Sequence, residues 1–136
     1  MKSYEKSYKG FVIWLLVFII LVFSIPILPT QNANLLTLAV MNLMSLSMAV
    51  LTWIIWKNEK IYWYNGIEFE KAKQATREQR KRYALRHAKR FTLFALAGIV
   101  YSVVAYHWSI PIGFTITVMG LGIVAVALST IKIKLE

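Results

Sequence analysis

The chain has 136 residues, of which 58% are hydrophobic and only 16% are charged, and its formal net charge is +10 at pH 7. Soluble domains carry roughly 25% charged residues, so this composition argues against a soluble globular protein. The absence of cysteine excludes disulfide bonds and thiolate chemistry.

Long runs without charge predict four membrane-spanning helices, because roughly 20 apolar residues cross a hydrocarbon core about 30 Å thick. The run that follows Lys2, Lys6 and Lys9 is similar to a signal peptide, but it is too long and lacks a small-residue cleavage pattern, so we expect an uncleaved helix. The last run is about twice the length of one span and is interrupted by HWSIPIG. We therefore expect one membrane domain with spans at residues 10–28, 35–56, 91–107 and 111–131 and a basic segment at 57–90.

The second span carries polar and small residues on one face, with Asn42, Ser45 and Ala49 at helical spacing. An unsatisfied amide is costly in hydrocarbon, so this face should contact another helix. Together with Ser102 of the third span, Asn42 and Ser45 are our candidates for an intramembrane polar contact. Two roles stay open for them: a hydrogen bond that holds helices together, or a contact with a transported solute or ion.

Aromatic residues gather where the second span meets the basic segment, which is typical of a membrane interface; they are Trp53, Trp56, Tyr62, Trp63 and Tyr64. Asn65-Gly66 then predicts a turn, either in a two-stranded hairpin or, as we expect, in an interfacial loop. No Gly or Pro follows before Gly98, so we predict one unbroken helix from near Ile67 into the third span. Its cytoplasmic part, about 23 residues, would reach roughly 35 Å.

Seven basic residues in this predicted helix are candidates for contact with lipid headgroups or a partner: Arg77, Arg80, Lys81, Arg82, Arg86, Lys89 and Arg90. The first three fall on one side of the helix and the last four on the opposite side. A helix that is polar all round projects into water or meets a partner. Glu78 and Arg82 should form an i,i+4 ion pair. No base-stacking pattern accompanies the charge, so we do not expect nucleic-acid binding.

The third and fourth spans each carry small residues along one face, and we select Gly98, Gly113 and Gly120 as helix-packing positions. Small residues let helix backbones approach closely in lipid. Because the connection between these spans is very short, we expect a tight antiparallel hairpin. The alternative is that the small-residue faces pair two copies of the chain.

The distribution of basic residues predicts the orientation of the chain. All 16 Lys and Arg lie in the N-terminal segment, the basic segment or the C-terminal tail, and none lies in residues 29–34 or 107–111. Lys and Arg are retained on the cytoplasmic side of short loops. We therefore predict an all-α, four-helix bundle in the inner or plasma membrane, with both termini in the cytoplasm and the third helix extended into it.

The sequence offers little for catalysis. It has no Asp, its six acidic residues are all Glu outside the spans, and it lacks HExxH, GxSxG and phosphate-binding Gly motifs. His87 and His107 are expected at opposite sides of the membrane, so they cannot share a metal. Glu68 and Glu70 could meet His87, but charged helices often offer such a group. We expect no enzymatic activity, cofactor or metal site.

In length and number of spans the chain is similar to small multidrug transporters and small fluoride channels. The transporters use a glutamate in the first helix, which GFVIWLLVFIILVF lacks, whereas Asn42 resembles the inward polar residue of the channels. Dual-orientation members of both groups need a weak charge bias, and here the bias is complete. We expect a non-enzymatic accessory, adaptor or immunity-type protein that acts through intramembrane helix contacts and the basic helix. Its expected partners are anionic lipid headgroups and another membrane protein or a second copy. The alternative is an oligomeric channel or transporter with a polar path around Asn42.

Overall fold

The computed structural model describes residues 4–136, and Lys2, which contributes to the charge argument, lies outside this range. Four long helices dominate the described chain: α1 (Lys9–Ser24), α2 (Ala33–Asn58), α4 (Arg77–His107) and α5 (Ile112–Ile131). Each is long and apolar enough to cross a membrane, which confirms the predicted number of helices of membrane-spanning length. Three short elements join them: η1 (Ile25–Ile27), η2 (Ile61–Trp63) and α3 (Phe69–Gln74). The residues that the structure describes form no strand.

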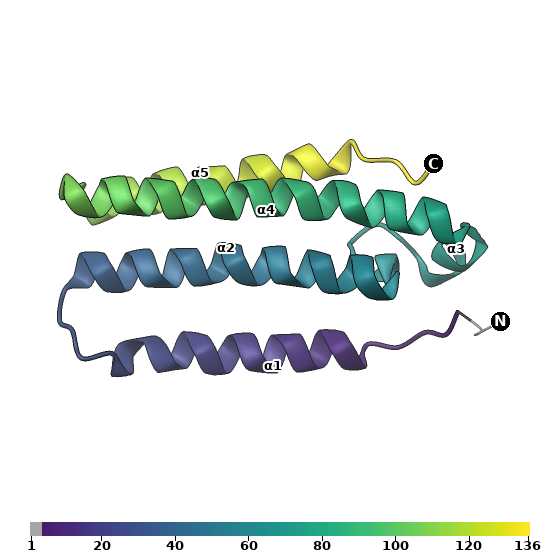
Figure 1. Cartoon of the computed structure of the whole chain (residues 1–136), viewed down its shortest axis with the longest axis horizontal. Helices are drawn as coiled ribbons and strands as arrows, with labels where there is room; N and C mark the ends of the chain where they lie inside the picture. The colour runs from purple at the N-terminus through teal and green to yellow at the C-terminus, as the bar shows by residue number, and fades with distance from the viewer. Residues whose placement is uncertain (1–3) are drawn as a thin grey trace.

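The long helices lie side by side with alternating direction, and the N-terminus, the C-terminus and α3 lie at the same end (Figure 1). We call this the basic end; it contains residues 4–9, 57–90 and 132–136. Helix α1 lies at the edge, beside α2, and buries none of its residues. The Trp14 indole N–H donates to the Ser47 carbonyl at 3.0 Å and links the two helices. Most of the α1 surface is thus apolar and uncovered, as suits a helix that faces lipid.

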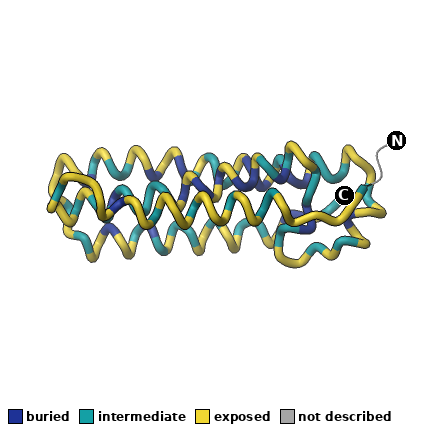
Figure 2. The backbone as a smooth tube through the Cα atoms, turned by 90° about the horizontal axis from the view of Figure 1, so that it is seen from below, coloured by how far each residue is buried: buried dark blue, intermediate teal, exposed yellow. Residues whose placement is uncertain are grey.

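The most extensive helix contact is between α2 and α4. Its α4 side consists mainly of small buried residues, namely Ala84, Ala88, Ala95, Gly98 and Ala105. Small side chains allow the two backbones to approach closely. Figure 2 shows buried segments on the inner sides of the helices and most extensively toward the basic end. Helix α4 also contacts α5, its expected antiparallel hairpin partner, but α2 is its principal neighbour.

The unbroken helix predicted from Ile67 is wrong, because α3 ends at Gln74 and α4 begins at Arg77. Thr76 caps α4: its hydroxyl accepts from the Gln79 backbone N–H at 3.2 Å, and the Gln79 side chain accepts from the Thr76 N–H at 2.8 Å. This capping box satisfies backbone donors that a new helix start leaves open. From Arg77 to residue 90, α4 extends about 21 Å, and α3 lies at its end in place of a longer projection (Figure 1).

Candidate functional site

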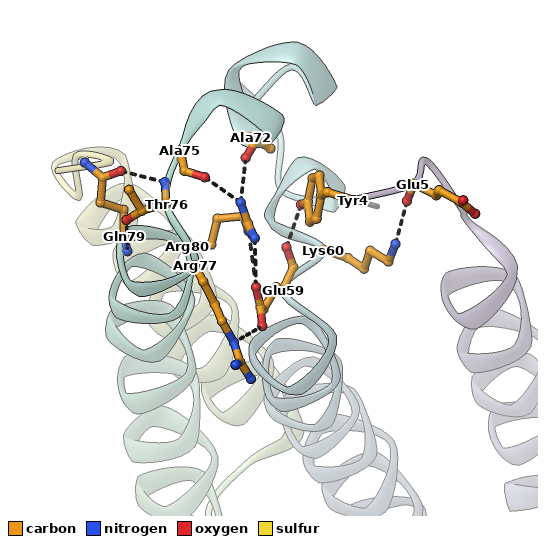
Figure 3. Close-up of polar contacts among 10 residues, drawn as sticks. All are labelled: Tyr4, Glu5, Glu59, Lys60, Ala72, Ala75, Thr76, Arg77, Gln79 and Arg80. Atoms are coloured by element: carbon orange, nitrogen blue, oxygen red, sulfur yellow. Dashed lines mark hydrogen bonds and ion pairs between the residues drawn. The ribbon is translucent and has the colours of Figure 1, made fainter. Parts of the chain in front are cut away.

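The basic end is built around Glu59, which ends α2 with a left-handed backbone (φ 60°). Its carboxylate accepts from Arg77 Nε at 2.9 Å and from Arg80 Nη2 at 3.0 Å (Figure 3). Arg80 also donates to the carbonyls of Ala72 and Ala75, so it joins the end of α2 to α3 and to the start of α4. The Arg80 side chain is only 11% exposed, whereas that of Arg77 is 77% exposed. Arg80 therefore links these three elements from a largely buried position.

The N-terminal segment is bound across the same region. The Tyr4 hydroxyl donates to the Glu59 carbonyl at 2.6 Å, and the Arg80 guanidinium lies 4.2 Å from the centre of the Tyr4 ring (Figure 3). Burial raises the pKa of Tyr4 to about 12, although the Arg80 charge acts in the opposite direction. Further along, the Tyr62 hydroxyl pairs with the backbone N–H and carbonyl of Ser7. The start of the chain is thus held by side chains from the middle of the sequence.

Aromatic packing completes this assembly. The Tyr4 and Phe69 rings stack at 5.7 Å between centroids, and Tyr62 meets Phe69 edge-on at 5.2 Å. The chain turns at Asn65-Gly66 without forming a strand, which agrees with the predicted loop, and Gly66 takes a positive φ of 90°. We call residues 4–8, residues 59–76 and the first turn of α4 the cap. The predicted aromatic belt thus contributes Tyr62 to a folded unit.

The seven candidate basic residues divide according to the two sides predicted from the sequence. Arg77 and Arg80 bind Glu59, and Lys81 Nζ lies 4.6 Å from the centre of the Trp56 ring. On the opposite side, Arg82, Arg86 and Lys89 are exposed and Arg90 is half-buried. Within the described residues, the first side thus contacts Glu59 and Trp56 of the same chain.

The outward side of α4 forms a continuous stripe. Arg82 pairs with Glu78 at 3.0 Å, as predicted for an i,i+4 pair, whereas Arg86 and Lys89 form no ion pair or hydrogen bond within the described residues. Towards the middle of the helix the same side continues with exposed apolar residues, Leu93, Leu96, Val100 and Val103. We call these cations and apolar residues together the outward stripe of α4.

The intramembrane candidates meet between α2 and α4. Asn42 Nδ2 donates to Ser102 Oγ at 2.6 Å and to the Leu38 carbonyl at 2.8 Å. Ser102 in turn donates to the Gly98 carbonyl, and Ser45 is only 2% exposed and donates to α2 carbonyls. Asn42 Oδ1 is buried without a hydrogen-bond partner. The structure thus places all three residues at one interhelical contact inside a single chain.

The predicted packing glycines differ in their surroundings. A Cβ placed on Gly98 would lie 3.1 Å from Met119 Cε, but one on Gly113 or Gly120 would meet nothing within 4 Å. Gly113 and Gly120 thus have no close neighbour among the described residues, and their role in packing stays a prediction. The close approach on α5 occurs at Gly122, where a Cβ would lie 2.6 Å from Phe94 Cε2. Small-residue spacing suggested the face but could not identify which glycine an aromatic ring covers.

A cleft of about 910 Å³, which the sequence did not predict, opens between α2, α4 and the C-terminal tail at the basic end. His87 lines it and is 4% exposed. Its ring stacks on the Tyr64 ring at 4.3 Å and lies tilted against the Tyr83 ring at 4.5 Å. His87 Nδ1 lies 3.1 Å from the Tyr83 carbonyl, so it acts as the donor there. The Tyr64 hydroxyl is buried without a partner, and burial raises the pKa of Tyr64 above its usual value.

The surroundings of His87 are aromatic, and the predicted alternative of a cluster with Glu68 and Glu70 finds no support in its contacts. Within residues 4–136, no group of three or more His, Asp or Glu side chains is placed to hold a metal ion. The described residues therefore present an exposed stripe on α4, a buried polar contact at Asn42 and a cleft at the basic end. Comparisons with protein-family models, with curated proteins and with solved structures find no match to this chain.

Proposed function

We propose that the chain is a non-enzymatic accessory or adaptor protein of the cell membrane. Its four long helices form a membrane bundle with both termini and the cap in the cytoplasm. Support for this orientation comes from the charges, since every Lys and Arg among residues 4–136 lies at the basic end. Reporter fusions at residue 32 and at the C-terminus test it, and matching signals from the two positions would contradict a four-span topology.

The outward stripe of α4 carries the proposal. Arg82, Arg86 and Lys89 are exposed at the membrane-facing end of a folded cap, and the exposed apolar residues that follow allow the same face to contact a helix in the bilayer. A partner with a transmembrane helix and acidic residues at its cytoplasmic end would match both parts of the stripe. In lipid, such helix pairs are held by van der Waals packing and polar contacts, and the cations fix their register.

The alternative of an oligomeric channel has one observation in its favour, the unpartnered Asn42 Oδ1. The other atoms of this cluster argue for a structural role, because Asn42 Nδ2 is bonded to Ser102 and Ser45 is almost completely buried. A conducting path through these residues would require separating α2 from α4, the most extensive helix contact. We therefore favour the accessory function.

The test uses a photo-crosslinking amino acid at position 93, on the outward stripe, and the same amino acid at position 23 as a control. Leu93 and Phe23 are both strongly exposed, but Phe23 lies on α1. We expect a discrete protein adduct from position 93 alone, which the triple variant Arg82→Gln/Arg86→Gln/Lys89→Gln loses. Three charges at about 1 kcal/mol each correspond to roughly two orders of magnitude in affinity.

The charge control is the variant Lys57→Gln/Lys71→Gln/Lys73→Gln, which removes the same number of exposed charges from other parts of the basic end. We expect this variant to keep the adduct. Lipid adducts alone from both positions, or equal loss of the protein adduct in both triple variants, would refute a partner site on α4.

A further inference from the structure

A second groove lies between α4 and α5, on the side of α4 adjacent to the outward stripe. Its volume is about 590 Å³, within the range of roughly 300–1,000 Å³ found for small-molecule sites. Leu93, Phe94 and Ala97 of α4 form one wall, and Ala125 and Leu128 of α5 form the other. The interior of the groove is therefore apolar along two neighbouring helices.

The two charged residues that line this groove are both cationic, Arg90 and Lys132. Arg90 directly precedes the charge-free run of residues 91–131, and Lys132 directly follows it. Because α4 and α5 are antiparallel, the groove brings these two sequence positions together at the boundary of the apolar region. With the helices in a membrane, this is the level of the lipid phosphates.

Arg90 is held in place by α5. Its guanidinium donates to the Ser129 carbonyl, which lies in the last turn of α5, where helix carbonyls lack an internal donor. A cation is also favourable at a helix C-terminus. The guanidinium has five N–H donors, and this contact uses one of its nitrogens, so the other donors can bind an anion. Arg90 is thus half-buried and oriented before any ligand arrives.

The Phe94 side of the apolar wall is also held in place, by packing against α5. The Phe94 ring lies over Gly122 so closely that any Cβ at position 122 would meet it at 2.6 Å. The glycine therefore lets the ring lie against α5, and the ring keeps its place as part of the groove surface.

We propose that this groove binds one anionic phospholipid, with its phosphate on Arg90 and Lys132 and one acyl chain between Phe94 and Leu128. Basic pockets between transmembrane helices on the cytoplasmic side are suited to such headgroups. The inference rests on the proposed membrane orientation, but it does not depend on the proposed partner of the outward stripe. The two cations that would hold the phosphate, Arg90 and Lys132, lie outside that stripe, and Leu93 is shared by the stripe and the groove wall.

Native mass spectrometry of the protein in neutral detergent, with added phosphatidylglycerol or phosphatidylcholine, tests the site. We expect one saturable phosphatidylglycerol adduct and a much weaker phosphatidylcholine adduct. The double variant Arg90→Gln/Lys132→Gln should bind phosphatidylglycerol roughly thirtyfold more weakly, at about a factor of five to six for each charge.

The matched control is Lys89→Gln/Lys134→Gln, which removes one charge from the same turn of α4 and one from the same tail, at positions that do not line the groove. This variant should bind phosphatidylglycerol like the wild type. Equal weakening in both double variants would mean that the lipid is attracted by the overall charge, and would overturn the proposal.

A third variant, Ala97→Trp, fills the apolar part of the groove and leaves both cations in place. It should lose the adduct while its helix content and thermal unfolding stay close to those of the wild type. Glycerol phosphate, which has the anion without acyl chains, should not displace phosphatidylglycerol. Retained binding in Ala97→Trp, or displacement by glycerol phosphate, would place the lipid elsewhere. The two proposals can fail separately. If position 93 gives no protein adduct but the phosphatidylglycerol adduct remains, the partner site on the outward stripe is refuted and the lipid site is retained.

Discussion

The variant Glu59→Gln tests how the cap is held together. It keeps the size of the side chain and one carbonyl acceptor, but it removes the carboxylate that pairs with Arg80. The other acceptors that the described residues offer to this guanidinium are backbone carbonyls. Arg80 is 11% exposed and Glu59 16% exposed, so the remaining cation would be largely withdrawn from water.

The expected magnitude follows from this burial. Removing one partner of a fully buried ion pair costs about 3–5 kcal/mol. Here Arg80 keeps two backbone acceptors, in Ala72 and Ala75, and the face of the Tyr4 ring. We therefore expect a smaller loss, about 2 kcal/mol, close to the value of one hydrogen bond to a charged group.

Limited trypsin digestion measures the effect, because Lys71 and Lys73 have exposed side chains but lie in the folded helix α3, whose backbone trypsin can cleave only when the cap opens. If opening and closing are fast relative to cleavage, the cleavage rate follows the population of the open form. A loss of about 2 kcal/mol then raises the rate roughly thirtyfold. Arg77→Gln serves as the control: its ion pair with Glu59 is 77% exposed on the arginine side and contributes at most about 1 kcal/mol. Equal cleavage rates for Glu59→Gln and the wild type would refute the role of the Glu59–Arg80 ion pair in keeping the cap closed.

Three further outcomes are expected. Gly122→Leu should lower the free energy of unfolding in detergent by about 1–3 kcal/mol, because Phe94 must move; Gly120→Leu should leave thermal unfolding unchanged, and a reversed order would contradict the assigned packing. Asn42→Ala should cost less than about 1 kcal/mol, since interhelical hydrogen bonds in membranes average about 0.6 kcal/mol and the change also removes an unpaired oxygen. The pKa of Tyr4 is raised from 10.0 to about 12. The stability that its protonated form contributes is therefore complete below pH 10 and is lost as the pH rises towards 12. Trypsin cleavage should accelerate over that range in the wild type and less in Tyr4→Phe.

The sequence was sufficient for the features that depend on hydrophobic length and on short-range pairing. The four spans follow from charge-free runs whose length matches the bilayer, and the Glu78–Arg82 pair follows from helix periodicity. Asn42 was also placed correctly at a helix contact, because a buried amide needs a partner wherever the neighbouring helix lies. These predictions needed no knowledge of which helices are neighbours.

The start of α4 carries a local signal that the prediction of an unbroken helix did not use. Thr76-x-x-Gln79 is a capping-box pattern, but the absence of Gly and Pro favoured an unbroken helix. Ala75 and Thr76 both take extended backbone conformations, which ordinary residues adopt readily. A helix can therefore end without Gly or Pro when a capping box begins the next helix.

The sequence alone could not show which basic residues form contacts within the chain and which stay exposed. The helical wheel separated Arg77, Arg80 and Lys81 from the other four, but both sides looked equally solvated. The distinction depends on Glu59, which is distant along the chain and is brought to α4 by the packing of α2 on α4. Long-range pairing of this kind has no periodicity to reveal it.

The backbone at Glu59 strengthens this interpretation. A left-handed φ of 60° at the end of a helix is usually taken by glycine, because other L-residues incur a cost of roughly 1–2 kcal/mol there. The carboxylate at this position bonds two arginines, and the backbone carbonyl of the same residue accepts from Tyr4. A glycine would relieve the backbone strain and lose both ion pairs. The position therefore favours glutamate only if the contact with Arg80 outweighs the strain. Glu59→Gln keeps the left-handed backbone and so measures the contact alone.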